Sequence, residues 1–382
     1  MINSIYLDNF KSLVDFDMNF NKFNCVVGLN GAGKSTLLQA MDFLSQLMRG
    51  DLEIWLDERQ WEASDLGSKL SSRMNIEFKL RLSAGNYQDF EWTGSVNRTT
   101  LRCTTETITL EGTTLLKVAD GTCFLRTLTK AEGERFPVVF DYQGSILSQL
   151  KEGQIKGALE TMRNEILNIR SLDLLSPAQL RLKTRSAEGH LGLGGQRLAA
   201  YLHELGKEGR DSLRTSLSPV YAQLESIDTS SLRSGWKQLG IKERFGKSLM
   251  TTPARHINDG MLRLMAVFSQ LASTEHFLLF DEIENGVNPE LVEFLVDALV
   301  KSPHQVMVTT HSPLILNYLD DDLAKNSVIY LYKKPNGSTK AVKLFAIPSL
   351  AEKLTVMGAG EAFVDTQLSR LVDEINGMAN EA

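Results

Sequence analysis

The first part of the chain alternates apolar and polar residues and then passes into a glycine-rich loop. Residues 1–27 show this alternation and end in the apolar run FNCVVG, which predicts two or three strands. The segment 34–50 carries apolar residues at helical spacing. Strand, glycine loop and helix in this order form the context that a phosphate-binding loop requires.

The middle of the chain has two different textures. Between about 75 and 145, β-branched and aromatic residues are separated by Gly, Asn and Asp, which predicts an antiparallel β-layer. From about 146 to 250 the pattern is mainly helical, with polar connections and no heptad repeat sustained over many turns. We therefore expect a helical insertion subdomain without a long coiled coil.

Residues 251–382 return to strands that alternate with helices. A turn and an apolar helix begin near 257, buried strands are predicted at 276–280 and 305–309, and a helix lies between those strands. This alternation predicts an α/β fold with a parallel or mixed core sheet. Four segments follow from the patterns: 1–74 as the first part of the core, 75–145 as the β-layer, 146–250 as the helical subdomain and 251–382 as the second part of the core.

Composition and charge narrow the function classes. The 382 residues are 42% hydrophobic and 23% charged, with a net charge of −6, which disfavours a chain coated in basic charge for nucleic acid. Three cysteines without paired spacing suggest neither a disulfide framework nor a zinc site. We find no secretory signal and no apolar run of the ~20 residues that a membrane span needs. A cytoplasmic protein with no membrane partner is expected.

The glycine loop carries the strongest chemical signal. Gly28 to Ser35 matches the pattern GxxxxGK[ST] at every position. Glycines let backbone N–H groups turn toward phosphates, Lys34 is expected at the β- and γ-phosphates of ATP, and the Ser35 hydroxyl is expected on Mg²⁺. A glycine turn before a core helix is the alternative. The predicted nucleotide contacts are Asn30, Gly31, Ala32, Gly33, Lys34, Ser35 and Thr36.

Acidic residues follow the buried strand of the second core segment. Asp281 emerges at the carboxyl end of this strand, where ligands bind in open α/β sheets, and is expected to hold the Mg²⁺ shell. Glu282 is expected to polarise the attacking water, with Glu284 as a weaker substitute. His311 follows the next strand and is placed to contact the γ-phosphate. A solvated strand end and an ordinary surface histidine are the structural alternatives.

Four segments, in this order, resemble the RecF/SMC/OLD-type branch of ABC ATPases, whose bacterial members are often labelled AAA-family ATPases. The resemblance is strong over residues 1–45 and 250–320 and only textural between them. The segments are IYLDNFKSLVDFDMNFNKFNCVVGLNGAGKSTLLQAMDFL, INDGMLRLMAVFSQL, FLLFDEIENGVNPELVEFLV and VMVTTHSPLIL.

The resemblance implies that two ATP molecules bind between two head domains. Each ATP then contacts the phosphate loop of one head and a signature turn of the other, which matches INDGMLRL here. Asn258 replaces the usual serine of this turn, and Asp259 and Gly260 follow it. Asparagine can still cap the next helix, whose N-terminus can face a phosphate, provided that Asp259 points away. A simple helix cap is the alternative.

Two further features follow from the resemblance. Residues 284–289 occupy the position of the family's dimer-contact loop, and they also read as an ordinary turn and helix start. A glutamine that senses Mg²⁺ and the γ-phosphate is expected where the β-layer meets the helical segment. Gln143 is the candidate and Gln179 is the rival. The glycine-rich segment 191–205 lacks Lys-Ser and a preceding strand, and is expected to be a loop and a helix start.

Three functions fit the pattern. In the first, the chain is the ATPase subunit of a bacterial anti-phage complex, and ATP-driven pairing of heads gates a separate effector such as a nuclease or toxin. In the second, it is a DNA-repair ATPase that clamps DNA directly. The third, a transporter subunit, is disfavoured by the long insertion and the atypical signature. Basic residues that are plausible DNA contacts, or simply a solvated face, are Arg170, Arg181, Lys183, Arg185, Lys242, Arg244 and Lys247.

Overall fold

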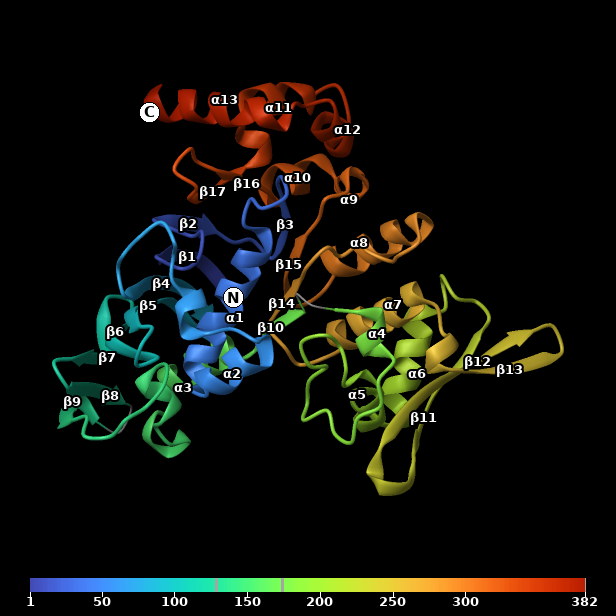
Figure 1. The fold of residues 1–382 in the computed structure, drawn as a ribbon, viewed down its shortest axis with the longest axis horizontal. Coiled ribbons are helices and arrows are strands. Elements are labelled where there is room, and N and C mark those ends of the chain that lie inside the picture. Colours follow the sequence, from blue (N-terminus) through green and yellow to red (C-terminus); the bar gives the residue numbers. More distant parts are fainter. Residues whose placement is uncertain (128–129, 173–174, 382) are drawn as a thin grey trace. The chain divides into compact units, whose positions relative to one another are not determined.

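The computed structural model describes residues 1–127, 130–172 and 175–381 (Figure 1). The chain divides into two compact units. The first combines Met1–Arg170 with Asp321–Ala382, and the second is Ser171–Asp320. The first unit is therefore built from both ends of the chain. The four segments expected from the sequence have other boundaries and remain a prediction.

The first unit contains an antiparallel sheet that joins the predicted β-layer to strands from the start of the chain. Among the described residues, eight strands follow the order β2-β1-β4-β5-β6-β7-β8-β9 (Figure 1). The antiparallel layer expected from the sequence is thus confirmed and is larger than expected. The strands are β1 (Ile2–Asp8), β2 (Phe16–Asn19), β4 (Asn75–Ala84), β5 (Tyr87–Asn97), β6 (Arg102–Leu110), β7 (Thr113–Ala119), β8 (Thr122–Thr127) and β9 (Lys130–Pro137).

Side-chain alternation explains why these segments form a sheet with one buried face. Along β4 every second residue is buried, including Phe78 and Leu80. Trp92 on β5 pairs with Leu80 in register, and its ring meets that of Phe78 edge-on at a centroid distance of 4.5 Å. Alternate residues in a strand point to opposite faces, so the apolar set forms a core and the polar set remains outside.

The strand that leads into the glycine loop belongs to a second sheet region of the first unit. β3 (Phe23–Val27) is buried along its whole length and pairs parallel with β16 (Val328–Lys333). β16 pairs antiparallel with β17 (Thr339–Lys343). Parallel strands with both faces covered read as continuous apolar runs, as FNCVV does.

Helices complete the first unit. The predicted helix after the glycine loop is present as α1. The helices are α1 (Lys34–Arg49), α2 (Leu52–Arg59), α3 (Ala158–Leu167), α10 (Asp321–Ser327), α11 (Pro348–Lys353), α12 (Ala359–Val364) and α13 (Leu368–Glu381), and the short strand β10 (Ile169–Leu172) lies where the two units meet in sequence.

The second unit holds the other parallel pair. β14 (Phe277–Phe280) and β15 (Gln305–Thr309) are fully buried and parallel, as the alternation of strands and helices predicts. The helices are α4 (Pro177–Leu180), α5 (Leu198–Glu204), α6 (Gly206–Leu217), α7 (Asp259–Leu271), α8 (Val292–Val300) and α9 (Pro313–Asn317).

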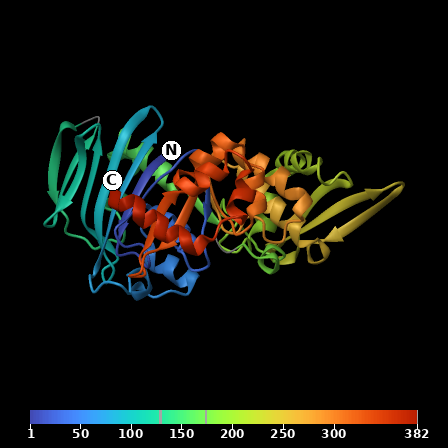
Figure 2. The same cartoon turned by 90° about the horizontal axis from the view of Figure 1, so that it is seen from above.

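The structure differs from the sequence-based expectation over residues 224–253. This part of the predicted helical segment forms an antiparallel sheet of β11 (Leu224–Ser231), β12 (Lys237–Phe245) and β13 (Ser248–Pro253). Buried Leu239 and Ile241 alternate with more exposed residues on β12, which is the period of a strand and not of a helix. In both views the yellow β12–β13 hairpin extends beyond the helices of its unit (Figures 1 and 2).

Two features of the described residues complete the picture. Cys25, Cys103 and Cys123 are buried, and none of them forms a disulfide. No described helix combines the length and the apolar character that crossing a bilayer requires.

A buried carboxylate lies in the core of the antiparallel sheet. Glu106 is 1% exposed and accepts hydrogen bonds from Trp92 Nε1 (2.8 Å), the Ile146 amide (3.0 Å) and the Ser145 hydroxyl. Burial raises the pKa of Glu106, and the three donors oppose that shift. The carboxylate therefore joins β5, β6 and the segment after β9 through one cluster of hydrogen bonds.

We predict that Glu106→Gln destabilises the fold by about 1–3 kcal/mol, because one amide oxygen replaces two acceptors and an NH₂ group faces buried donors. Urea denaturation at neutral pH measures this loss. The control Glu77→Gln changes an exposed residue of β4 and should stay within about 0.5 kcal/mol of wild type. Equal stability of Glu106→Gln and wild type would show that the cluster contributes nothing.

Candidate functional site

The glycine loop adopts a conformation that side chains would obstruct. Gly33 is the N-cap of α1 with φ 110°, and a Cβ there would lie 2.6 Å from Thr339 Oγ1. A Cβ on Gly28 would lie 2.3 Å from the carbonyl oxygen of Leu331. The backbone therefore approaches β16 and β17 too closely for any other residue. A Cβ on Gly31, in contrast, would meet nothing within 4 Å, so this part of the loop faces open space.

Lys34 is turned back over the loop. Its Nζ donates to the carbonyl oxygens of Gly28 (2.8 Å) and Leu29 (3.3 Å), and the residue is 6% exposed. The ammonium is therefore held by two carbonyl groups of the loop. Phosphate oxygens are stronger acceptors than carbonyl oxygens, so a bound phosphate can take over the ammonium as a partner. Ser35 is exposed and Thr36 is half-buried in the first turn of α1.

The remaining predicted loop residues have different environments. Asn30 is exposed at the tip of the loop. Ala32 is buried, and its carbonyl oxygen accepts a hydrogen bond from Thr339 Oγ1 (2.8 Å), which also bonds to Ser12 Oγ (2.8 Å). Thr339 thus fixes the loop to β17, a contact that the sequence does not signal because the partners lie 307 positions apart.

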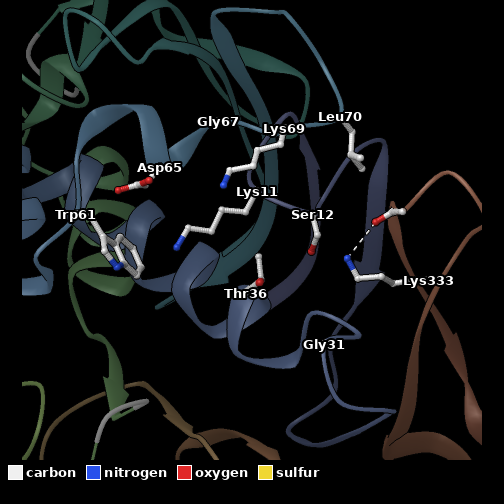
Figure 3. Close-up of a pocket in the computed structure, with 11 residues that line it drawn as sticks. Lys11, Ser12, Gly31, Thr36, Trp61, Asp65, Gly67, Lys69, Leu70 and Lys333 are labelled. Carbon is white, nitrogen blue, oxygen red and sulfur yellow. Dashed lines mark hydrogen bonds between the residues drawn. The ribbon is translucent and has the colours of Figure 1, made fainter.

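A cavity of about 630 Å³ opens beside the loop within the first unit (Figure 3). The lining combines loop residues with three lysines, which gives the cavity a positive charge. Lys11 Nζ lies 3.2 Å from the ring centroid of Trp61 and 3.0 Å from Gln39 Oε1. The volume falls in the range of small-molecule sites. The main lining residues are Lys11, Gly31, Thr36, Trp61, Lys69 and Lys333.

In the second unit, β14 and β15 bring the predicted acidic pair and Thr309 together. Asp281 follows β14 directly, and its Oδ1 accepts from the Thr309 hydroxyl. Thr309 Oγ1 in turn accepts from the amide of Glu282 (2.9 Å). Glu282 has φ 43°, an uncommon backbone conformation for this residue type. The two neighbouring carboxylates have different partners, since Asp281 contacts Thr309 and Glu282 contacts His311.

Glu282 and His311 lie together, as their positions after neighbouring strands predict. His311 Nε2 is 3.0 Å from Glu282 Oε1, and Asn285 Nδ2 donates to Glu282 Oε2. Both side chains are about 40% exposed, so solvent can reach the pair. A carboxylate oriented by two neighbours and open to water is suited to accept a proton from that water.

Glu284 has a different role in this geometry. Its Oε1 accepts from the Thr310 hydroxyl (2.8 Å) and from the amides of His311 (3.0 Å) and Ser312 (3.1 Å). The carboxylate therefore shapes the loop after β15. This use of Glu284 leaves Glu282 as the better candidate for the general base.

A buried arginine connects the acidic loop to helix α7. The Arg263 guanidinium donates to the carbonyl oxygens of Asp281 (3.3 Å) and Glu282 (3.1 Å), and the residue is 7% exposed. Burial lowers the pKa of Arg263, while the charges of Glu284, Glu282 and Asp281 oppose that effect. The sequence offered no local signal for this contact, since Arg263 reads as one polar residue in an apolar helix.

The predicted signature turn forms the start of α7. Asn258 is the N-cap, and its side chain accepts from the Met261 amide (2.8 Å). A Cβ on Gly260 would lie 2.9 Å from the carbonyl oxygen of Gly286, so the turn packs against the segment 284–289. The helix cap expected as the simpler alternative is therefore present, and it is compatible with a phosphate at the helix N-terminus.

The two glutamine candidates have different surroundings. Gln143 Oε1 accepts from the Glu53 amide at the start of α2 (3.1 Å), within the first unit. Gln179 is exposed on α4 of the second unit. The role of either residue toward a nucleotide remains a prediction.

The donor chemistry fits Mg²⁺ bound together with a nucleotide. A hydroxyl at Ser35 and a carboxylate at Asp281 are hard oxygen ligands, and Mg²⁺ usually takes one or two protein oxygens alongside phosphates and water. In the part of the chain that the structure describes, no three His, Cys, Asp or Glu side chains are grouped as a metal site.

Two family models match separate parts of the chain. Residues 1–135 match a model described as "AAA ATPase domain". Residues 203–317 match one described as "AAA domain, putative AbiEii toxin, Type IV TA system". The first match contains the glycine loop and the second contains the signature turn and acidic pair.

The chain is also similar to an ABC-type ATP-binding protein and to solved SMC heads. The chain is 26% identical over 136 residues to the "Uncharacterized ABC transporter ATP-binding protein YfmR" of Bacillus subtilis; the match covers 35% of this chain and about a fifth (21%) of that protein. An SMC head bound to the C-winged helix domain of ScpA is similar at TM-score 0.55 and 17% identity, covering 93% of this chain and 99% of that one. A Pyrococcus furiosus structure, an Smc head with an extended coiled coil bound to the C-terminal domain of ScpA, gives TM-score 0.51 and 16% identity, with coverage of 93% and 99%. At these identities the structures establish the fold.

We predict that Lys34→Ala abolishes ATP binding, because the cation at the mouth of the loop is lost. Titration with a fluorescent ATP analogue should show no saturable binding. The control Lys22→Ala changes an exposed lysine before β3 and should bind like wild type. Unchanged affinity of Lys34→Ala would remove the loop from the binding site.

Proposed function

We propose that this chain, an ABC-type P-loop ATPase of the RecF/SMC-like branch, hydrolyses ATP to open and close a pair of heads that controls a separate effector protein. The observation that carries the proposal is the Glu282–His311 pair beside Asp281 at the ends of two parallel strands. The proposal builds on the two AAA family matches, on the SMC-head fold and on the ATPase chemistry that such domains indicate.

Each residue has a defined task in this proposal. Loop amides and Lys34 bind the phosphates. Ser35, in the first turn of α1, and Asp281, directly after β14, are the residues that would hold Mg²⁺. The metal supplies charge neutralisation at the phosphates when bound. Glu282 accepts a proton from the attacking water, while His311 holds the carboxylate in place and faces the terminal phosphate.

The lysine-lined cavity is proposed to take the nucleoside part of ATP. It adjoins Gly31 and Thr36 of the phosphate loop, which places it within reach of a nucleotide bound there. The ring of Trp61 and the three lysines suit an aromatic base attached to a polyanion.

Pairing of two heads is proposed from the signature turn. The N-terminus of α7 carries no intrahelical acceptor for its first amides and is capped by Asn258, so it can receive a phosphate from a second copy. The contact of Gly260 with residue 286 connects this turn to the loop after the acidic pair. ATP bound by both copies would hold the two heads together, and its hydrolysis would let them separate.

A partner effector protein is proposed on the basis of two comparisons. The model matching residues 203–317 is described through a toxin of a toxin–antitoxin system, which supports a role in defence. The similar SMC heads were solved with a bound partner, ScpA. A head that acts on a partner protein, in an anti-phage complex, is therefore the function we favour.

Direct DNA clamping is the second candidate, and one surface favours it. A cavity of about 480 Å³ on the β7–β9 face is lined by Lys117, Phe124 and Arg135, which pair across three adjacent strands. An aromatic ring between two cations suits a stacked base and its phosphates. Against this role, Lys242 and Arg244 of the predicted basic set are paired with Asp228 and Glu225.

We predict that Glu282→Gln retains ATP binding, lowers the hydrolysis rate by at least a hundredfold and traps an ATP-bound dimer, because an amide cannot accept the proton from water. Phosphate release measures hydrolysis, and light scattering after size exclusion measures mass with and without ATP. Glu293→Gln, which alters an exposed acid of α8, is the matched control. Normal hydrolysis by Glu282→Gln would refute the assignment of the general base.

Effector gating and DNA clamping predict different salt and mutation responses. Under effector gating, the double variant Lys117→Ala/Arg135→Ala should form head pairs in the presence of ATP as wild type does. The native protein should also co-purify with another protein. A DNA affinity that falls steeply with salt and drops at least tenfold in this double variant would favour clamping instead. Filter binding of single- and double-stranded oligonucleotides measures both effects.

A further inference from the structure

The start of helix α7 holds an ion pair that the ATPase motifs do not explain. Arg181, which directly follows α4, donates from Nη2 to Asp259 Oδ1 at 2.5 Å. Asp259 is the first residue of α7, between the cap Asn258 and Gly260. The pair therefore lies within the proposed signature turn, where a polyanion is expected.

The guanidinium is anchored independently of Asp259. Nη2 also donates to the carbonyl oxygen of Ile257 (2.7 Å), and Nη1 donates to that of Pro177 (2.9 Å). The side chain of Arg181 is 24% exposed and that of Asp259 is 55% exposed. The arginine is thus preorganised by backbone acceptors, while the carboxylate is the exchangeable, solvent-facing partner.

Charge makes this arrangement unusual for a phosphate contact. An exposed carboxylate in the first turn suits the helix dipole, but it repels a triphosphate that approaches the same turn. A guanidinium binds carboxylate and phosphate with the same planar donor geometry. The dianionic terminal phosphate of ATP is the stronger acceptor and can displace the carboxylate.

We propose that Arg181 is a phosphate-binding residue of the signature turn, held by Asp259 in the unpaired head and transferred to the terminal phosphate of the ATP on a second copy. No covalent bond changes in this exchange. The inference rests on the proposed pairing of heads and assigns it a specific residue. It also reassigns one cation of the basic set from DNA to nucleotide.

In this proposal Asp259 competes with the terminal phosphate of ATP for the guanidinium of Arg181. Removing the carboxylate frees Arg181 and should favour pairing, whereas removing Arg181 should weaken pairing in the presence or absence of Asp259. A charge-neutralising role would give another pattern, because Asp259→Ala would then restore the activity lost in Arg181→Ala. A purely structural ion pair would make both single variants equally defective.

The experiment is a double-mutant cycle in the Glu282→Gln background, with the dimer dissociation constant measured by analytical ultracentrifugation in ATP. We expect Arg181→Ala to weaken pairing roughly hundred- to ten-thousandfold, because each pair of heads contains two such contacts and each charged hydrogen bond contributes about ten- to hundredfold. Asp259→Ala should tighten pairing severalfold, and the double variant should be as weak as Arg181→Ala. Arg181→Lys should recover part of the loss.

Controls separate this inference from the proposed function. Binding of a fluorescent ATP analogue to the isolated head and the urea midpoint should be unchanged in Arg181→Ala. Restoration of pairing in the double variant, equal defects in the two single variants, or normal pairing of Arg181→Ala would overturn the role of Arg181. If Glu282→Gln itself does not pair in ATP, the proposed function fails before Arg181 is tested.

Discussion

The buried guanidinium of Arg263 is the interaction on which the second unit depends. It joins helix α7 to the backbone of the acidic loop through the carbonyl oxygens of Asp281 and Glu282. A buried cation is costly unless acceptors and opposite charge lie close to it. Here the loop after β14 supplies two carbonyl acceptors and three carboxylates. The helix and the loop therefore stabilise each other, so neither is expected to move far alone. This contact fixes the start of α7 relative to Glu282, which suits the proposed dependence of hydrolysis on pairing.

Much of the candidate site could be located from the sequence, because its residues lie in short, local patterns. The glycine loop, the acids after β14 and His311 after β15 each follow a strand that is buried along its whole length, and such strands are legible as apolar runs. Their order along the chain also indicated the family, and the family models and the fold agree with it. The meeting of Glu282 with His311 follows from the rule that neighbouring parallel strands end at the same edge.

Other features were invisible because they depend on contacts between distant residues. Arg263, Thr339 and the Lys11–Trp61 pair read as unremarkable polar or aromatic residues until the fold brings their partners near. The three-stranded sheet over 224–253 was missed for another reason. Its strands are rich in charged and hydroxyl residues and bury few side chains, so the apolar alternation that marks a strand is weak.

The pairing of β3 with β16 has a consequence for how the protein is made. The strand that carries the glycine loop finds its parallel neighbour some 300 residues later, after the whole second unit has been synthesised. Chains emerge from the ribosome from the N-terminus, and contacts of such long sequence separation form late. A nascent chain therefore exposes β3 without β16. It also lacks the contacts that Gly28 makes with β16 and Gly33 makes with β17. The glycine loop is therefore expected to reach its final conformation only after β16 and β17 have been synthesised.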